Sequence, residues 1–147
     1  MDVSEITPTL LVGTNACCMM HYKLLLIERG VLHDVSLEGE NVDAPFGAET
    51  YLWLPTPDHE APSLMSLWLG VQHIREVIEK GGRVYVHCKN GHGRGPTLAA
   101  AHLISTGMTL DEAVAAVRHG RPETHLEPIQ YDALKSFFHD FTARAKN

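Results

Sequence analysis

The chain has 147 residues, of which 44% are apolar and 20% are charged, and its 12 basic and 18 acidic side chains give a net charge of −6. These proportions are those of an ordinary globular protein, so they exclude a disordered chain, a collagen-like fibre and a coiled coil, and the acidic balance argues against nucleic acid as a partner. No run approaches the roughly 20 apolar residues of a membrane span, and three cysteines are too few for a disulfide framework, so we expect a single cytoplasmic domain over residues 1–147.

The first half of the chain alternates short apolar runs with helical patterns. In chain order, it predicts a strand over 7–13, a helix over 16–29, strands over 31–37 and 50–54, and a helix from Ser63 to about Lys80. Gly30 closes the first helix, and Pro55 and Pro57 end the third strand. The acidic, glycine-bearing residues 38–48 indicate a loop between the second and third strands.

The second half contains the clearest strand and two well-marked helix starts. In chain order, it predicts a strand over 83–87, helices over 96–105 and from Thr109 to about His119, and a last helix that begins near Glu127. Thr109 and Glu112 have the spacing of a capping box. The last helix carries an apolar stripe that we expect in the core: Leu134, Phe137, Phe138 and Phe141.

Strands that alternate with helices predict an α/β fold, with a mainly parallel twisted sheet of about four to five strands and helices on both faces. In such sheets, ligands bind beyond the carboxyl ends of the strands. The glycine-rich residues 88–95 follow the strand at 83–87 and precede a small apolar helix. We therefore expect a phosphate-binding loop between a central strand and a buried helix.

A cysteine and an arginine frame this loop, with Cys88 at its start and Arg94 at its end. Gly91 and Gly93 allow a tight turn whose N–H groups point inward and form a nest for an anion at the start of the helix. The planar guanidinium of Arg94 can bind two oxygens of a phosphate. Because the same donors stabilise a thiolate, Cys88 is a candidate nucleophile for phosphoryl transfer.

These residues resemble the HCxxGxxR signature of the cysteine-dependent protein tyrosine phosphatase superfamily, here filled by His87, Cys88, Gly91 and Arg94. The short chain is similar to the small, atypical dual-specificity phosphatases. Pro57-Asp58 resembles the family's general-acid loop, and Arg121-Pro122 followed by Gln130 resembles a pattern near the C-terminus of small members. The resemblance covers nearly the whole chain.

The resemblance implies a mechanism that needs no metal ion or cofactor. Cys88 attacks phosphorus and forms a thiophosphate intermediate, and Asp58 protonates the leaving oxygen. Gln130 orients the water that hydrolyses the intermediate, and His87 supports the thiol from behind the loop. The phosphoryl oxygens are bound by Lys89, Asn90, Gly91, His92, Gly93 and Arg94.

The sequence departs from the family pattern directly after the arginine. The family has Ser or Thr there, whose hydroxyl helps the cysteine sulfur to leave, whereas this chain has Gly95. The departure predicts slow breakdown of the intermediate unless Thr97 or a water molecule replaces the hydroxyl.

The implied partner is a phosphorylated protein or a small phosphoester, with phosphotyrosine as the first expectation. Lys89 and His92 also resemble the loop of lipid-directed members, so phosphoinositides, RNA 5′ ends and phosphorylated glycans stay open as non-protein substrates. A non-catalytic phosphate-binding module is a second alternative. Arsenate or thiol-transfer chemistry, with Cys17 or Cys18 as the resolving thiol, is a third.

We expect the remaining cysteines and histidines to serve the fold and not to bind a metal ion. We expect Cys17 and Cys18 to be small buried apolar residues, as helical cysteines usually are. Ten histidines invite a metal interpretation, but neither an HExxH motif nor paired Cys/His spacing is present, so the sequence predicts no metal site.

Overall fold

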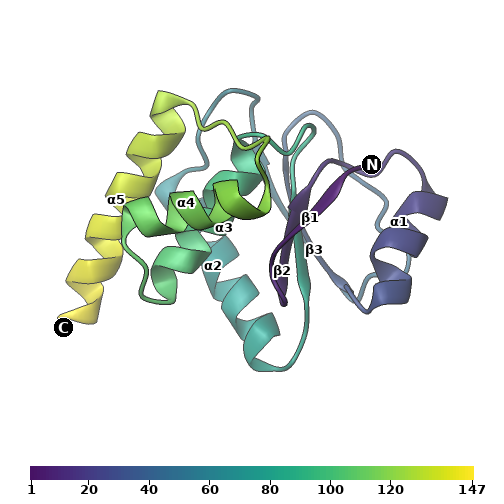
Figure 1. The fold of residues 1–147 in the computed structure, drawn as a ribbon, viewed down its shortest axis with the longest axis horizontal. Coiled ribbons are helices and arrows are strands. Elements are labelled where there is room, and N and C mark those ends of the chain that lie inside the picture. The colour runs from purple at the N-terminus through teal and green to yellow at the C-terminus, as the bar shows by residue number, and fades with distance from the viewer.

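The computed structural model describes residues 1–147 and contains a five-stranded sheet with five α-helices (Figure 1). The strands are β1 (Val3–Thr7), β2 (Leu10–Gly13), β3 (His33–Glu38), β4 (Thr50–Thr56) and β5 (Val84–His87). The helices are α1 (Met19–Leu25), α2 (Leu64–Glu79), α3 (Arg94–Ser105), α4 (Leu110–Gly120) and α5 (Pro128–Ala145), and a short 3₁₀ turn covers Ile27–Arg29.

The sheet has the strand order β1-β2-β5-β3-β4, and every pairing is parallel except the one between β1 and β2. Helices α2 to α5 lie on one side of the sheet and α1 lies on the other (Figure 1). The predicted α/β class, the mainly parallel sheet and the helices on both faces are therefore confirmed.

The two faces of the sheet carry two apolar cores of different size. The larger core is formed by α2 to α5 on the sheet and includes Leu134 and Phe137 of the predicted stripe, with Phe138 and Phe141 packed against it. The smaller core lies beneath α1 and contains five buried residues, among them Tyr22 and Tyr85. Strand β5 contributes to both cores, because it is central and buried along its whole length.

Two predictions about strands are wrong. Strand β1 was not expected, because its sequence VSEIT mixes polar and apolar residues and the strand is only partly buried. Strand β4 does not stop before Pro55 but continues to Thr56. It lies at the edge of the sheet, where a proline need not donate to a neighbouring strand.

Most helix ends follow the local signals, but the helix predicted over 16–29 is shorter: α1 begins at Met19 and ends at Leu25, before a separate 3₁₀ turn. Ser63 caps α2 by accepting a hydrogen bond from the N–H of Ser66, and Thr109 and Glu112 form the predicted capping box. Gly30 adopts the left-handed conformation with φ of 75° that ends the first helical segment. Helix α3 begins at Arg94, two residues earlier than predicted, and all of its residues are buried. No helix in the structure has the length and apolar character that crossing a bilayer would require.

Candidate active site

The loop from Cys88 to Gly93 joins β5 to α3 and folds back over the cysteine sulfur. Gly91 has φ of +68°, and a Cβ atom at this position would lie 2.6 Å from the carbonyl oxygen of Gly13. Only glycine fits both restrictions. The turn brings the N–H of Gly91 to 3.3 Å from Sγ of Cys88, where it donates to the sulfur. The loop therefore has the inward-facing amide that the sequence predicts.

A cavity of about 180 Å³ contains the predicted nucleophile, arginine and acid. Its lining residues are Asp58, His59, Cys88, Asn90, His92, Gly93, Arg94, His125, Glu127 and Gln130. Lys89 and Thr97 do not line it. The structure thus brings together three segments that are far apart in the sequence: the loop after β4, the loop after β5 and the start of α5.

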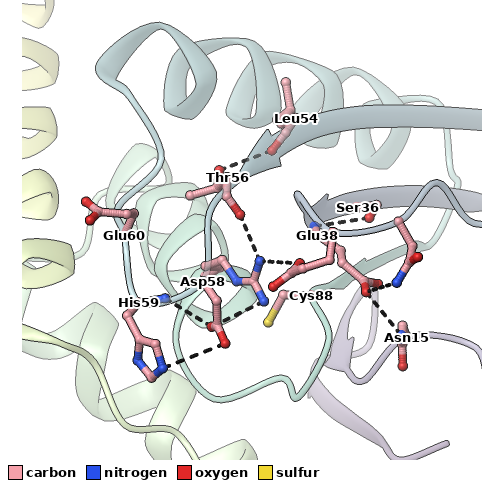
Figure 2. A network of polar contacts seen from close by, with 12 residues as sticks. Asn15, Ser36, Glu38, Leu54, Thr56, Asp58, His59, Glu60 and Cys88 are labelled. Carbon is pink, nitrogen blue, oxygen red and sulfur yellow. Dashed lines mark hydrogen bonds and ion pairs between the residues drawn. The ribbon is translucent and has the colours of Figure 1, made fainter.

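Arg94 is held in place by acceptors on both sides of its guanidinium group. Its Nη1 donates to Oε2 of Glu40 at 2.9 Å and to the carbonyl oxygen of Thr56 at 2.8 Å. Its Nη2 lies 3.3 Å from Oδ1 of Asp58. Figure 2 shows Asp58 and Cys88 close together, with dashed contacts from Asp58 and Thr56 that meet at the guanidinium.

Electrostatics keep this group charged although its side chain is only 2% exposed. Burial lowers the pKa of Arg94, but the hydrogen bond that Arg94 donates to Glu40 and the nearby negative charges outweigh burial and leave this pKa raised. In turn, the hydrogen bond from Arg94 lowers the pKa of Glu40. Glu40 was not among the predicted site residues, because nothing in the acidic loop marks one carboxylate from the others.

His59 connects the loop that carries Asp58 to Glu127 at the start of α5. Oδ1 of Asp58 accepts the backbone N–H of His59 at 3.0 Å, and the His59 ring lies 3.7 Å from Oδ2 of Asp58 (Figure 2). The other ring nitrogen of His59 lies 3.2 Å from Oε1 of Glu127. His59 has φ of 64°, an uncommon conformation for a residue other than glycine. The histidine thus links the candidate acid to the start of α5.

Gln130 reaches the cavity, but both ends of its amide group are already bonded. Its Oε1 accepts from the backbone N–H of Glu127 at 2.9 Å, and its Nε2 donates to the carbonyl oxygen of Glu60 at 3.0 Å. The side chain is buried against Gly93, where an added Cβ would lie 2.6 Å from Oε1. This geometry ties the acid loop to α5, and the predicted orientation of a water molecule by Gln130 stays a prediction.

The Thr97 hydroxyl donates to a backbone carbonyl and not to the cysteine sulfur. Its Oγ1 donates to the carbonyl oxygen of Gly93 at 2.7 Å, within the first turn of α3. In this arrangement Thr97 does not supply the hydroxyl that Gly95 lacks.

His87 lies behind the loop in a buried cluster of carboxylates. Its Nε2 is 2.9 Å from Oδ1 of Asp34 and 3.2 Å from Oδ2 of Asp43. Burial lowers the pKa of His87, but the hydrogen bond and charge of Asp34 outweigh it, so this pKa is raised. The hydroxyl of Tyr22 donates to the other oxygen of Asp34 at 2.7 Å, and burial followed by the charge of Asp34 raises the pKa of Tyr22.

A second buried arginine, Arg121, holds the loop without lining the cavity and was not predicted to do so. Its Nε donates to the carbonyl oxygen of Gly91 at 2.6 Å and its Nη2 to that of Asn90 at 3.4 Å. Its Nη1 lies 3.2 Å from Oδ2 of Asp2. The Arg121-Pro122 pair was visible in the sequence, but its contact with a loop 30 residues away was not.

The chain is similar to known proteins in sequence and in structure. The family model described as "Dual specificity phosphatase, catalytic domain" matches residues 27–138. The rat protein named phosphatidylglycerophosphatase and protein-tyrosine phosphatase 1 is 35% identical over 156 aligned positions, which cover 96% of this chain and 78% of the relative. The human protein of the same name is 42% identical over 85 residues, which cover 57% of this chain and 42% of the relative.

Solved structures agree with the sequence comparisons. A crystal structure of PTPMT1 superposes with a TM-score of 0.88 at 31% identity and covers 99% of this chain and 100% of that chain. A second crystal structure, of PTPMT1 in complex with PI(5)P, has the same TM-score at 30% identity and covers 97% of this chain and 98% of that chain. The match to the human relative spans less than half of that relative's length.

Proposed function

Because the chain belongs to the dual-specificity phosphatase family and is a cysteine-based phosphatase, we propose that its residues 1–147 act as one catalytic domain with Cys88 as the nucleophile. One observation carries this assignment. The sulfur of Cys88 lines a cavity that is also lined by the charged guanidinium of Arg94 and the carboxylate of Asp58. These are the three groups that phosphoryl transfer to a thiolate requires.

In the first step, the Cys88 thiolate attacks phosphorus, an S–P bond forms and the P–O bond to the leaving group breaks. The leaving oxygen takes the proton of Asp58. The N–H groups of the loop and the guanidinium of Arg94 bind the phosphoryl oxygens as their charge redistributes. Because the start of α3 and Arg94 together supply positive charge, no step requires a metal ion.

In the second step, water attacks the cysteinyl-phosphate. Asp58, now a carboxylate, takes a proton from the water, the S–P bond breaks, and the thiolate and inorganic phosphate are released. His59 holds the Asp58 loop against α5 at Glu127, so the carboxylate stays beside the cavity through both steps.

The walls of the cavity favour a polar leaving group over an aromatic one. Apart from Cys88, every lining side chain is charged, polar or absent, and none belongs to phenylalanine, tyrosine, tryptophan or an aliphatic residue. A phosphotyrosyl ring gains affinity from apolar walls, whereas a hydroxylated headgroup gains it from hydrogen bonds. We therefore favour the phosphorylated headgroup of a lipid as the substrate, and phosphoprotein hydrolysis stays a prediction from the sequence.

Exposed apolar residues on the segments that form the cavity also favour a lipid substrate. Four exposed apolar side chains come from the segments that also build the site: Val42, Leu64, Met65 and Ile129. Val42 follows Glu40, Leu64 and Met65 follow the acid loop, and Ile129 precedes Gln130. Exposed apolar side chains on the segments that form a polar site suit an enzyme that works at a lipid surface. They also agree with relatives named phosphatidylglycerophosphatase and with a neighbour crystallised with PI(5)P.

A substrate panel tests both parts of this proposal. We expect turnover of phosphatidylglycerophosphate in vesicles with a kcat/KM at least about tenfold above that for phosphotyrosyl peptides, a difference of roughly 1.4 kcal/mol in transition-state binding. The Cys88→Ser variant should be inactive on both. Activity that survives in Cys88→Ser would overturn the catalytic assignment. Faster turnover of peptides than of lipids, lost in Cys88→Ser, would overturn the substrate choice alone.

A double variant outside the cavity tests whether these exposed apolar residues act in lipid binding and not in phosphoryl transfer. Met65→Gln combined with Ile129→Gln should lower kcat/KM on vesicles but leave hydrolysis of a soluble aryl phosphate unchanged, because neither side chain lines the cavity. Equal losses on both substrates would show that these residues act on the fold and not at a lipid surface.

A further inference from the structure

Two cysteines and a histidine converge on the surface away from the catalytic cavity. Sγ of Cys17 lies 2.9 Å from Nδ1 of His21, and Sγ of Cys18 lies 3.3 Å from the same nitrogen. The three donor atoms lie within 4.8 Å of one another. Both thiols are free and exposed, so the expectation that Cys17 and Cys18 are buried apolar residues is wrong.

The backbone explains why these side chains meet. His21 lies in the first turn of α1, whereas Cys18 is the N-cap residue and Cys17 comes directly before it, so the chain entering the helix brings both thiols to the ring. Cys18 is extended, with φ of −166° and ψ of 162°, and its thiol reaches the same ring nitrogen. Nothing in the fold needs this arrangement, because an exposed pair of free thiols adds little packing and is open to oxidation.

We infer that Cys17, Cys18 and His21 form a binding site for a thiophilic metal ion, with Zn²⁺ as the ion that best fits two thiolates and an imidazole. Zinc takes sulfur at about 2.3 Å and nitrogen at about 2.0–2.1 Å in tetrahedral geometry. In a tetrahedral site with these bond lengths, sulfur and nitrogen lie about 3.6 Å apart. The two S···N distances, now 2.9 and 3.3 Å, must therefore lengthen, and small rotations of exposed side chains at Cys17, Cys18 and His21 allow this. Ions that prefer carboxylate oxygen ligands, such as Mg²⁺, do not suit this donor set.

The three donors leave one position of the tetrahedron for water or an external ligand. Binding releases the thiol protons to solvent and forms two S–Zn bonds and one N–Zn bond, with no oxidation or reduction. None of the three residues lines the catalytic cavity, so this site is separate from the phosphatase chemistry.

The site is nevertheless connected to the phosphate-binding loop. Asn15 lies two residues before Cys17. Its backbone N–H donates to the carbonyl oxygen of Lys89 at 3.3 Å, and its Nδ2 donates to Oε1 of Glu38 at 3.3 Å. An ion that fixes residues 17–21 therefore also restrains the segment that contacts this loop. We expect zinc to raise the Tm of the protein for this reason.

The test uses the full chain with Cys88→Ser as the background, so that the catalytic thiol does not bind metal. Zn²⁺ is titrated against a chromogenic chelator, and Co²⁺ is added separately to observe the thiolate-to-cobalt charge-transfer band. We expect one equivalent of Zn²⁺ to bind and the cobalt band to appear. Cys17→Ser with Cys18→Ser, and separately His21→Gln, should each weaken binding by at least about tenfold.

His119→Gln is the matched control, because His119 is an exposed histidine of α4 outside this cluster and should leave binding unchanged. Circular dichroism establishes that each variant is folded. Unchanged zinc affinity in the folded double cysteine variant overturns the proposal, as does an absent cobalt band. Equal losses in His119→Gln and His21→Gln indicate scattered histidine binding and also overturn it.

Discussion

Arg121 donates a hydrogen bond from Nε to the carbonyl oxygen of Gly91 at 2.6 Å, across 30 residues of sequence and from a side chain that is 1% exposed. Its second contact, from Nη2 to the carbonyl oxygen of Asn90, holds the neighbouring peptide group. These two hydrogen bonds fix the peptide groups that follow Asn90 and Gly91, and the N–H of Gly91 donates to Sγ of Cys88. Arg121 thus positions the phosphate-binding loop without touching the substrate.

Replacement of Arg121 tests this role. Arg121→Met keeps much of the buried volume but leaves two loop carbonyl groups without a donor, so the free energy of unfolding should fall by about 2–4 kcal/mol. The kcat should fall as well, while Cys88 still reacts with iodoacetamide in the folded variant. Urea unfolding and steady-state kinetics measure the two effects. Arg118→Met, on the exposed side of α4, is the control and should change neither.

The parts of the site that are contiguous in sequence could be predicted from it. The strand, loop and helix from Val84 to Ser105 follow one another directly, so their spacing alone indicated an anion-binding loop that starts with Cys88 and ends with Arg94. The capping residues and Gly30 were equally local. Such signals depend on a few neighbouring residues and do not require knowledge of the tertiary fold.

The groups that support the loop could not be predicted, because they come from distant segments. Glu40 contacts Arg94 across 54 residues, and Asp34 contacts His87 across 53. Each is one acidic residue among the chain's 18, with no motif to distinguish it. Strand β1 was missed for a related reason, since its pairing with β2 and not its own composition makes it a strand.

The pair of His87 and Asp34 predicts a pH dependence of stability. The pKa of folded His87 is raised above the ordinary value of 6.5, so its charge stabilises the fold most below about pH 6.5 and this contribution is lost as pH rises through the raised pKa. Asp34→Asn should therefore cost about 1–3 kcal/mol at low pH and less at high pH. Urea unfolding across pH measures this dependence.

NMR titration of the His87 ring provides an independent measurement of the same effect. Asp34→Asn should lower the pKa of His87, because burial then acts against the charge of the ring without the hydrogen bond and the charge of Asp34. Asp132→Asn, an exposed carboxylate of α5, serves as control. A destabilisation by Asp34→Asn that is the same at every pH would show that the asparagine disturbs packing and not the charge of His87.

Asp58 should matter most where the leaving group needs a proton. Asp58→Ala is expected to lower kcat on alkyl phosphates by about 10²–10⁴-fold and to have a much smaller effect on p-nitrophenyl phosphate, whose leaving group departs as an anion. Parallel kinetics with the two substrates measure the difference. Glu60→Ala should have little effect, since only the backbone carbonyl of Glu60 is bonded in the site. Equal losses on both substrates for Asp58→Ala would assign the acid to another residue.

Gly95 predicts slow breakdown of the cysteinyl-phosphate. Related phosphatases have a hydroxyl at this position, and the Thr97 hydroxyl is bonded to Gly93 and does not replace it. Rapid mixing with p-nitrophenyl phosphate should therefore show a burst of about one equivalent of phenolate followed by a slower steady rate. A progress curve that is linear from the first turnover would contradict slow breakdown.

Gly95→Ser should restore the missing contact. A Cβ atom at this position would lie 3.4 Å from the nearest atom, the carbonyl carbon of His87, so the side chain fits without a backbone shift. A hydroxyl that donates to the leaving sulfur contributes about 1.4 kcal/mol, so the steady rate should rise about tenfold and the burst should shrink. Gly95→Ala adds the carbon without the hydroxyl and should keep the wild-type burst. If alanine and serine speed the second step equally, the gain comes from a more rigid start of α3 and not from a hydrogen bond to sulfur.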